Sequence, residues 1–445
     1  MKALSQRGGR LRALICGPKA SGKSTFSRYL LNHILSPLPA GEKDDENDGV
    51  AFLDLDPGQP EFSPMGQVYL AHLRRPFFGP PFTHASLEGS IGGETIRAHH
   101  IGATSPKDDA DHYVQAAMDL MQRYQTLLMR YPQCPLVINY PGWIFGQGLE
   151  VAMWLIGSLG LTDVVYMSEK GPPEVVQPLA HAAQMASVPL TTLPSQPTDF
   201  ASRSSAQLRT MQIQSYFHQT HPPGIQSPLW QDTPMSQVKS ISVDYAGPQA
   251  GILGIMLMGP PVSVDLLHEV IEGSIVGVVA IESRRAIRGG EEEEAEEEED
   301  VDGGEAVRQR VEQAVTRTSE KLPYMLTGSG SSITLDPRVS YSLGVAMVRK
   351  IDVERERLEL VTPIPGSRIV KAMRQGDGFI LLRGQLDNPN WAISEAYYAA
   401  RAQTKKKGKF GDNGVRRAVQ QTGWMRVEEG GEGREKQIWK LRKRV

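Results

Sequence analysis

The stretch GPKASGKS, residues 17–24, decides the fold. It fills every position of the pattern G-x-x-x-x-G-K-[ST], which forms a loop whose backbone N–H groups surround phosphate. The apolar run 10–16 before it predicts a strand, and residues 23–35 after it predict an amphipathic helix. Because motif and context agree, a phosphate-binding P-loop is favoured over a glycine-rich turn that matches by accident.

Each part of this loop has an expected role in holding a nucleotide. Gly17 and Gly22 let the backbone curl toward a phosphate, and the start of the following helix adds a partial positive charge. Lys23 is expected to reach the β- and γ-phosphates, and the Ser24 hydroxyl to bind Mg²⁺. The predicted nucleotide-binding residues, for ATP or GTP with Mg²⁺, are Gly17, Pro18, Lys19, Ala20, Ser21, Gly22, Lys23, Ser24 and Thr25.

Two aspartates follow the next predicted strand, which covers residues 50–56. The carboxyl end of such a strand opens onto the phosphate-binding loop in a parallel sheet. Asp54 and Asp56 are two residues apart, so on a strand they would face the same side. One could bind Mg²⁺ and the other accept the proton of an attacking hydroxyl, with Gln59 orienting the acceptor. An ordinary Asp-Pro-Gly surface turn is the alternative.

The rest of the first half alternates apolar strands with helices, which predicts an α/β P-loop NTPase fold with a parallel sheet flanked by helices. After about residue 236, short apolar or alternating runs predict a β-rich C-terminal domain. The expected strands and helices of the first half lie at 109–131, 135–140, 147–159, 162–168, 174–186 and 188–193, and the later strands at 251–258, 274–282, 339–348 and 379–386. The expected domains are 1–235, 236–400 and a basic tail, 401–445.

Charged residues are concentrated in two segments of this 445-residue chain, although its net charge is only −3. Nine of the ten residues 291–300 are acidic, which predicts a disordered insertion at 288–305. The tail 401–445 carries 14 Lys and Arg against 5 Asp and Glu. It could contact RNA phosphates, act as a nucleolar address, bind an acidic partner, or be a solvated disordered tail.

Two further features bear on the compartment. The two cysteines, Cys16 and Cys134, lie in apolar runs and are expected to be buried thiols, which fits a reducing compartment. No stretch approaches the roughly 18 consecutive apolar residues of a membrane span, so no membrane partner is expected.

Five segments together resemble the polynucleotide 5′-hydroxyl kinases, and are most similar to the nucleolar pre-rRNA-processing branch of fungi and animals. The resemblance implies an ATP- and Mg²⁺-dependent kinase that phosphorylates 5′-hydroxyl ends of RNA in the nucleus and nucleolus. It also implies that an rRNA-processing endonuclease docks on the C-terminal region. The segments are GPKASGKSTF (17–26), DLDPGQPEF (54–62), IGATSP (101–106), LVINYPGW (136–143) and LRTMQIQSYFH (208–218).

The resemblance also assigns roles to single residues. Lys23 and Ser24 would hold ATP and Mg²⁺, Asp54 would be the base, and Asp56 a Mg²⁺ ligand or positioning partner. The acceptor would be contacted by Gln59, by a loop with Thr104 and Ser105, and by a clasp with Tyr140, Gly142 and Trp143. Trp143 would stack on a terminal base, and Arg209 would belong to a lid that closes on the transferred phosphoryl group, with Arg203 a weaker candidate.

The chain departs from the family in three ways. Tyr140 stands where the family commonly has threonine, and residues 291–304 form an acidic insertion without a catalytic role. The β-sandwich domain that precedes the loop in the family is not in these 445 residues, which suggests a fragment or a shortened gene model. A nucleoside kinase or GTPase is one alternative, although no N-K-x-D element follows a strand. A catalytically weak P-loop scaffold of an endonuclease complex is another.

Overall fold

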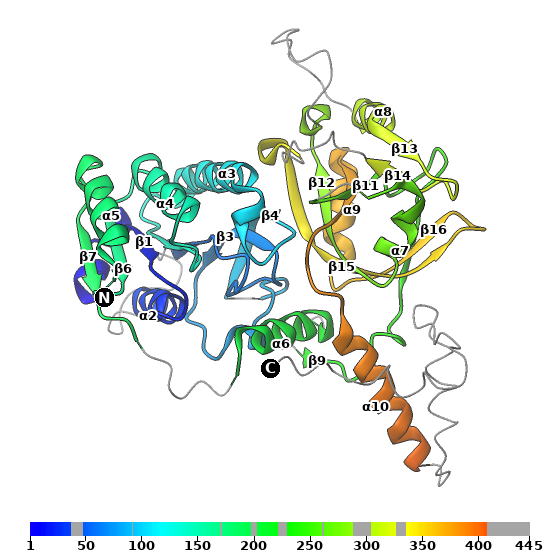
Figure 1. Ribbon diagram of the computed structural model, residues 1–445, viewed down its shortest axis with the longest axis horizontal. Helices are drawn as coiled ribbons and strands as arrows, with labels where there is room; N and C mark the ends of the chain where they lie inside the picture. The colour runs from blue at the N-terminus through cyan, green and yellow to red at the C-terminus, as the bar shows by residue number, and fades with distance from the viewer. Residues whose placement is uncertain are drawn as a thin grey trace.

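The computed structural model describes residues 1–36, 48–90, 92–169, 171–196, 203–220, 229–259, 262–287, 304–325 and 335–406. Two sheets organise these residues, one in each half of the chain (Figure 1). A two-stranded ribbon, β8 (Gln219–Thr220) with β9 (Leu229–Trp230), lies between the halves in sequence. None of the described helices is long and apolar enough to cross a membrane.

The first sheet has seven strands in the order β4-β3-β2-β5-β1-β6-β7. The strands β2, β5, β1, β6 and β7 run parallel, as the predicted P-loop fold requires. Their bounds agree with the predicted runs to within two residues. The strands are β1 (Arg12–Cys16), β2 (Val50–Asp54), β3 (Gln67–Leu73), β4 (Gly93–His100), β5 (Leu136–Asn139), β6 (Asp163–Met167) and β7 (Leu190–Leu193).

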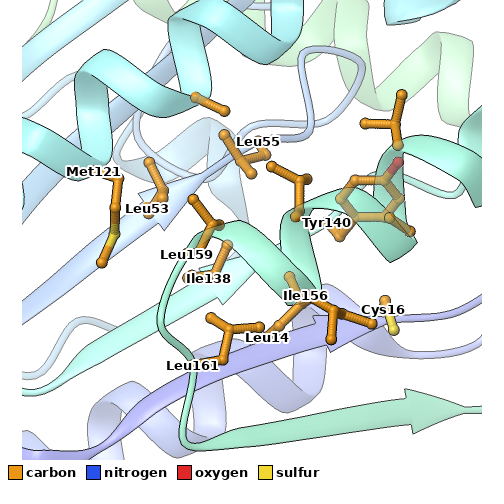
Figure 2. Close-up of a cluster of buried hydrophobic side chains, with 14 of the residues drawn as sticks. Leu14, Cys16, Leu53, Leu55, Met121, Ile138, Tyr140, Ile156, Leu159 and Leu161 are labelled. Carbon is orange, nitrogen blue, oxygen red and sulfur yellow. The ribbon is translucent and has the colours of Figure 1, made fainter. Parts of the chain in front are cut away.

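Helices cover both faces of this sheet (Figure 1). One face packs against α3, α4 and α5, and the other against α2, because each strand is apolar on both sides. Figure 2 shows the first of these cores, where Leu14, Leu53 and Ile138 come from three neighbouring strands. The helices are α1 (Lys2–Ser5), α2 (Lys23–Leu35), α3 (Ala110–Arg130), α4 (Gln147–Ser158), α5 (Pro173–Met185) and α6 (Ser205–His218).

The sheet is mixed and not wholly parallel as predicted, because β3 and β4 join one edge in antiparallel fashion. The connection from β2 to β3 contains no helix, and Gly66 ends it at a φ of 88°. Parallel neighbours need a long crossover, usually helical, so this short connection returns the chain antiparallel.

The second half forms a β-rich domain around an eight-stranded sheet, as predicted. The strand order is β10-β16-β15-β12-β17-β11-β14-β13, and helices accompany it (Figure 1). The elements are β10 (Ile241–Asp244), β11 (Gly254–Leu257), α7 (Leu267–Ile271), β12 (Ile275–Ile281), α8 (Gly304–Ala314), β13 (Val315–Arg317), β14 (Pro323–Met325), β15 (Ser340–Asp352), β16 (Arg357–Val361), α9 (Gly366–Gln375), β17 (Gly378–Arg383) and α10 (Asn390–Lys406).

Two predicted segments extend beyond what the structure describes. Residues 288–303 of the acidic insertion lie outside the described residues, whereas Gly304 and Glu305 begin α8 and are therefore helical. The basic tail starts within α10, and its residues 407–445 lie outside the described part of the chain.

A buried arginine joins the two domains. Arg97 on β4 is 7% exposed, and its guanidinium donates to both carboxylate oxygens of Glu282 at 2.8 and 2.7 Å. The same side chain lies 3.4 Å from the buried Asp119 of α3 and over the ring of Tyr341. It also donates to three backbone carbonyls between Pro337 and Ser340. One side chain thus holds α3, β4 and the second domain together.

We predict that Arg97→Ala lowers the free energy of unfolding by about 3–5 kcal/mol, because the buried Asp119 would lose one of its cationic neighbours and Glu282 its bidentate partner. Arg123→Ala is the matched control, since Arg123 contacts the same carboxylate at 3.4 Å but is 36% exposed. Its loss should be about 1 kcal/mol or less. Urea denaturation measures both, and equal losses would contradict the hub role of Arg97.

Candidate functional site

The site forms where three parallel strands end side by side. Asn139 of β5 is in register with Ile15 of β1 on one side and with Asp54 of β2 on the other. The glycine-rich loop begins immediately after β1, and the Asp-Pro-Gly turn begins immediately after β2. The sheet topology therefore brings the two sequence motifs to one edge, as predicted.

The phosphate-binding loop has the backbone shape that its glycines allow. Gly17 has a φ of 142°, and a Cβ there would lie 2.6 Å from the Met167 carbonyl oxygen. Gly22 has a φ of 96° and precedes the first turn of α2. Lys23 folds back over the loop, where its Nζ donates to the Pro18 carbonyl at 2.9 Å.

Lys23 is a buried cation held by an acidic neighbour. Its side chain is only 6% exposed, and burial lowers the pKa of the ammonium from its ordinary value. The carboxylate of Asp56 acts against this change and raises the pKa of Lys23. Because the phosphate-binding loop and the turn of Asp56 follow neighbouring strand ends, Lys23 and Asp56 lie at the same edge of the sheet.

Asp54 is fully buried and accepts four hydrogen bonds. One oxygen accepts from the Asn139 amide at 2.9 Å and from the Asp56 N–H at 3.2 Å. The other accepts from the Glu61 N–H at 2.8 Å and from the Tyr69 hydroxyl at 3.0 Å. Two of these donors are the two ends of the turn 56–61, so Asp54 fixes the shape of that turn.

Asp56 occupies a different environment, although sequence spacing placed both aspartates on one strand face. The strand β2 ends at Asp54, so Asp56 lies in the turn, half-buried, where its Oδ1 accepts from the N–H groups of Gly58 and Gln59. Burial raises the pKa of Asp56, while the charges of Lys23 and Arg209 oppose this rise. Lys23 in the phosphate-binding loop and Arg209 on helix α6 thus both favour the ionised form of Asp56.

Helix α6 brings Arg209 toward this carboxylate. Gln212, one turn further along, donates to the carbonyls of Pro60 at 2.6 Å and Ser63 at 2.8 Å, which ties the helix to the chain that follows Asp56. Arg209 is half-buried, whereas Arg203 is exposed and precedes the helix. The structure therefore favours Arg209 over Arg203.

The loop with Thr104 and Ser105 lies against the turn 56–61. A Cβ at Gly58 would be 2.5 Å from the Thr104 carbonyl oxygen, so backbone meets backbone there. The second domain supports the same loop, because Gln385 donates its N–H to the Gly102 carbonyl at 2.7 Å. Gly384 also packs so closely on Gly102 that no side chain fits between them.

The predicted clasp contacts the phosphate-binding loop, but the role predicted for one of its residues, Tyr140, has to be corrected. A Cβ at Gly142 would lie 2.9 Å from the Lys19 Cα, so this turn contacts the loop directly. The prediction of a substrate contact by Tyr140 is wrong for its side chain, which points into the core (Figure 2). Its phenol donates to the Gly148 carbonyl at 2.8 Å. Trp143 is half-buried, with its ring against Gly148.

Sequence reasoning missed the residues that hold the turn in place. Tyr69 lies on the unpredicted strand β3, and Asn139 was only part of a predicted strand. Glu61 is buried within the motif itself, where Arg28 donates to both of its oxygens and His84 contacts one. A polar residue ending an apolar strand, as Asn139 does, was the signal available in the sequence.

Comparisons with known proteins agree with this geometry. The model of the family described as mRNA cleavage and polyadenylation factor CLP1 P-loop matches residues 17–219. A Neosartorya fischeri protein named polynucleotide 5′-hydroxyl-kinase grc3 is 63% identical, over 91% of this chain and 52% of its own length. An Aspergillus clavatus protein of the same name is 57% identical, over 100% of this chain and 61% of its own length. The chain belongs to this polynucleotide 5′-hydroxyl-kinase family.

More distant proteins add to the comparison. A Gibberella zeae member of the kinase family is 36% identical over 89% of this chain and 52% of its own length. The chain thus spans between half and two thirds of the length of these relatives. A solved Clp1p chain, from a Clp1p–Pcf11p complex, shares the fold at 16% identity and a TM-score of 0.52, over 86% of this chain and 76% of that one.

Family membership confirms the α/β P-loop fold and implies that the loop binds a nucleotide. Among the described residues, no group of three or more His, Cys, Asp or Glu could hold a metal by itself. Magnesium in kinases is usually bound by one or two protein oxygens together with substrate phosphates, so Ser24 and Asp56 suit that donor chemistry.

The pH dependence of stability should report the environment of Asp54. Burial raises the pKa of Asp54 from 3.8 to about 7, although the Asn139 amide opposes this. The folded protein keeps this proton to higher pH than the unfolded chain. The stabilisation is therefore complete below about pH 4 and is lost as pH rises to about 7.

Asp54→Asn removes this titration. We expect the stability of wild type relative to the variant to fall by at least about 1 kcal/mol between about pH 5 and pH 8. Denaturation curves at several pH values measure the difference, with the exposed Asp265→Asn as the control. Curves for wild type and Asp54→Asn that change in parallel with pH would contradict the prediction.

Proposed function

We propose that this protein transfers the γ-phosphoryl group of ATP to the 5′-hydroxyl end of RNA. The proposal is carried by one observation: β1, β5 and β2 end in register, so the phosphate-binding loop with Lys23 and the turn with Asp56 lie at one edge of the sheet. Phosphoryl transfer needs cations around the transferred group and a carboxylate beside the attacking hydroxyl. The names of the fungal relatives support the same reaction.

On the phosphate side, the N–H groups of residues 17–25 and the ammonium of Lys23 would hold the phosphates of ATP. Ser24 would bind Mg²⁺, which neutralises charge on the phosphates when it is present, and the Asp56 carboxylate would stay free to accept the hydroxyl proton. Arg209 would add positive charge where the phosphoryl group leaves ATP.

On the acceptor side, we assign the two aspartates differently from the family resemblance. A base must come within hydrogen-bond reach of the hydroxyl proton, so geometry precedes pKa in choosing it. Asp54 has no exposed surface and four donors already fill its lone-pair directions. Asp56 would therefore face the substrate, and Asp54 would act as a positioning residue that holds the turn.

The remaining predicted contacts fit around this pair. Gln59, half-exposed in the turn, and the loop with Thr104 and Ser105 would line the acceptor path. Gly142 would keep the clasp close to the phosphate-binding loop, and Trp143 would stack on a terminal base. The proposal extends to pre-rRNA processing in the nucleolus with an endonuclease bound to the C-terminal region, as the family resemblance implies.

The decisive experiment measures transfer of label from γ-labelled ATP to an RNA oligonucleotide with a 5′-hydroxyl. Lys23→Ala should lower kcat by about 100-fold or more, because positive charge at the transferred group is lost. Asp56→Asn should lower kcat by about as much, because the proton acceptor of the hydroxyl is lost. Asp54→Asn should lower kcat and the melting temperature together, whereas Asp56→Asn should leave the melting temperature nearly unchanged. Lys371→Ala, an exposed cation on α9, is the control.

The outcomes separate the alternatives. Label on free nucleosides in place of oligonucleotides would identify a nucleoside kinase. Nucleotide binding without any transfer would favour a scaffold. Loss of activity in Asp54→Asn without a change in melting temperature would restore Asp54 as the base.

Trp143→Ala tests the clasp separately. We expect the KM for the RNA acceptor to rise about tenfold while the KM for ATP stays the same, because stacking on a base is worth about 1–3 kcal/mol. Trp143→Phe should recover most of the affinity. Equal changes in both KM values, together with a lower melting temperature, would show that Trp143 serves the core alone.

A further inference from the structure

A cavity opens on the α2 side of the first sheet. Its volume is about 340 Å³, within the range of small-ligand sites, and five of its fourteen lining residues carry aromatic rings. The cavity lies between the chain that follows β3 and the residues that follow α6. The ring-bearing and cationic residues of the wall are Phe62, Phe77, Phe78, His84, Trp230 and Arg75.

The floor is rigid and the rim is exposed. Phe62, Phe77 and His84 pack ring against ring, with centroids 4.4 to 5.2 Å apart. In contrast, Phe78 is 78% exposed and Trp230 is 49% exposed. Large exposed aromatic side chains beside a preformed cavity indicate a surface that stacks on a flat ligand.

The charge of the wall is positive. Glu61, which lies under the floor, is neutralised by Arg28 and contacts His84. Arg75 lines the cavity, is exposed, and forms no ion pair with another described residue. Aromatic rings with an available guanidinium are the combination that binds single-stranded nucleic acid.

Two segments lead from the proposed catalytic site to this cavity. Residues 56–62 begin with Asp56 and end with Phe62, which lines the cavity. Helix α6 runs alongside, from Arg209 near Asp56 to Ser215, about 9 Å further on. Ser215 accepts from the Trp230 indole at 2.8 Å and donates to the Phe82 carbonyl, so the helix also fixes the rim.

We infer that this aromatic cavity binds a base of the RNA acceptor, downstream of the nucleotide whose 5′-hydroxyl is phosphorylated. The inference rests on the proposed function for its substrate class and adds a second contact along the same RNA strand. A dinucleotide would engage the catalytic site alone, and a longer RNA would reach the cavity as well. We therefore expect acceptor affinity to depend on acceptor length, and this dependence to require Phe78 and Trp230.

The test compares a 5′-hydroxyl dinucleotide with a decanucleotide of RNA as acceptors. Phe78→Ala and Trp230→Ala should raise the KM for the decanucleotide about tenfold and leave kcat and the dinucleotide KM unchanged. Trp154→Ala is the matched control, because Trp154 is 44% exposed on α4, against the other face of the sheet. Trp230→Phe keeps a ring and should recover most of the lost affinity.

Binding measured by fluorescence anisotropy with a labelled decanucleotide separates this inference from the proposed function. Weaker binding in both variants supports the cavity even if no phosphoryl transfer is detected. An unchanged decanucleotide affinity overturns the inference even if the protein is an active kinase. Equal losses for both acceptor lengths, with a lower melting temperature, overturn it in favour of a purely structural role.

Discussion

A single buried carboxylate determines the geometry of the catalytic edge. Asp54 has no contact with solvent, so each of its lone pairs must be satisfied by the protein, since an unsatisfied buried charge is strongly unfavourable. The donors come from three places, namely Asn139 on β5, Tyr69 on β3 and the two ends of the turn 56–61. The sheet and the turn can therefore reach full hydrogen bonding only in one mutual arrangement, and that arrangement keeps the turn with Asp56 at the edge where the phosphate-binding loop begins.

The second domain also helps to fix this arrangement. Its Gln385 holds Gly102 through the backbone, and Gly102 in turn donates to the Gly66 carbonyl at the end of the turn region. Arg97 connects β4 to the same domain through its ion pair with Glu282. The loop that faces the catalytic turn is thus positioned from both sides.

Local sequence patterns were sufficient to predict some of this structure and insufficient to predict the rest. The phosphate-binding loop and α2 could be predicted to the residue because glycine spacing and helical periodicity are properties of adjacent residues. The antiparallel strands β3 and β4 could not, because β3 is buried along its whole length and so does not alternate, and the buried end of β4 carries Arg97, His99 and His100. Tyr140 was misassigned for a similar reason, since only the fold shows that its ring points into the core.

The contact between Gly102 and Gln385 has a consequence for synthesis of the protein. Residues 17–25 are translated before Gln385, which follows β17. Domains generally fold as they emerge, so the first sheet can form while the loop 101–106 still lacks support from Gln385. A nascent chain would then form its phosphate-binding loop before the loop 101–106 is held in place.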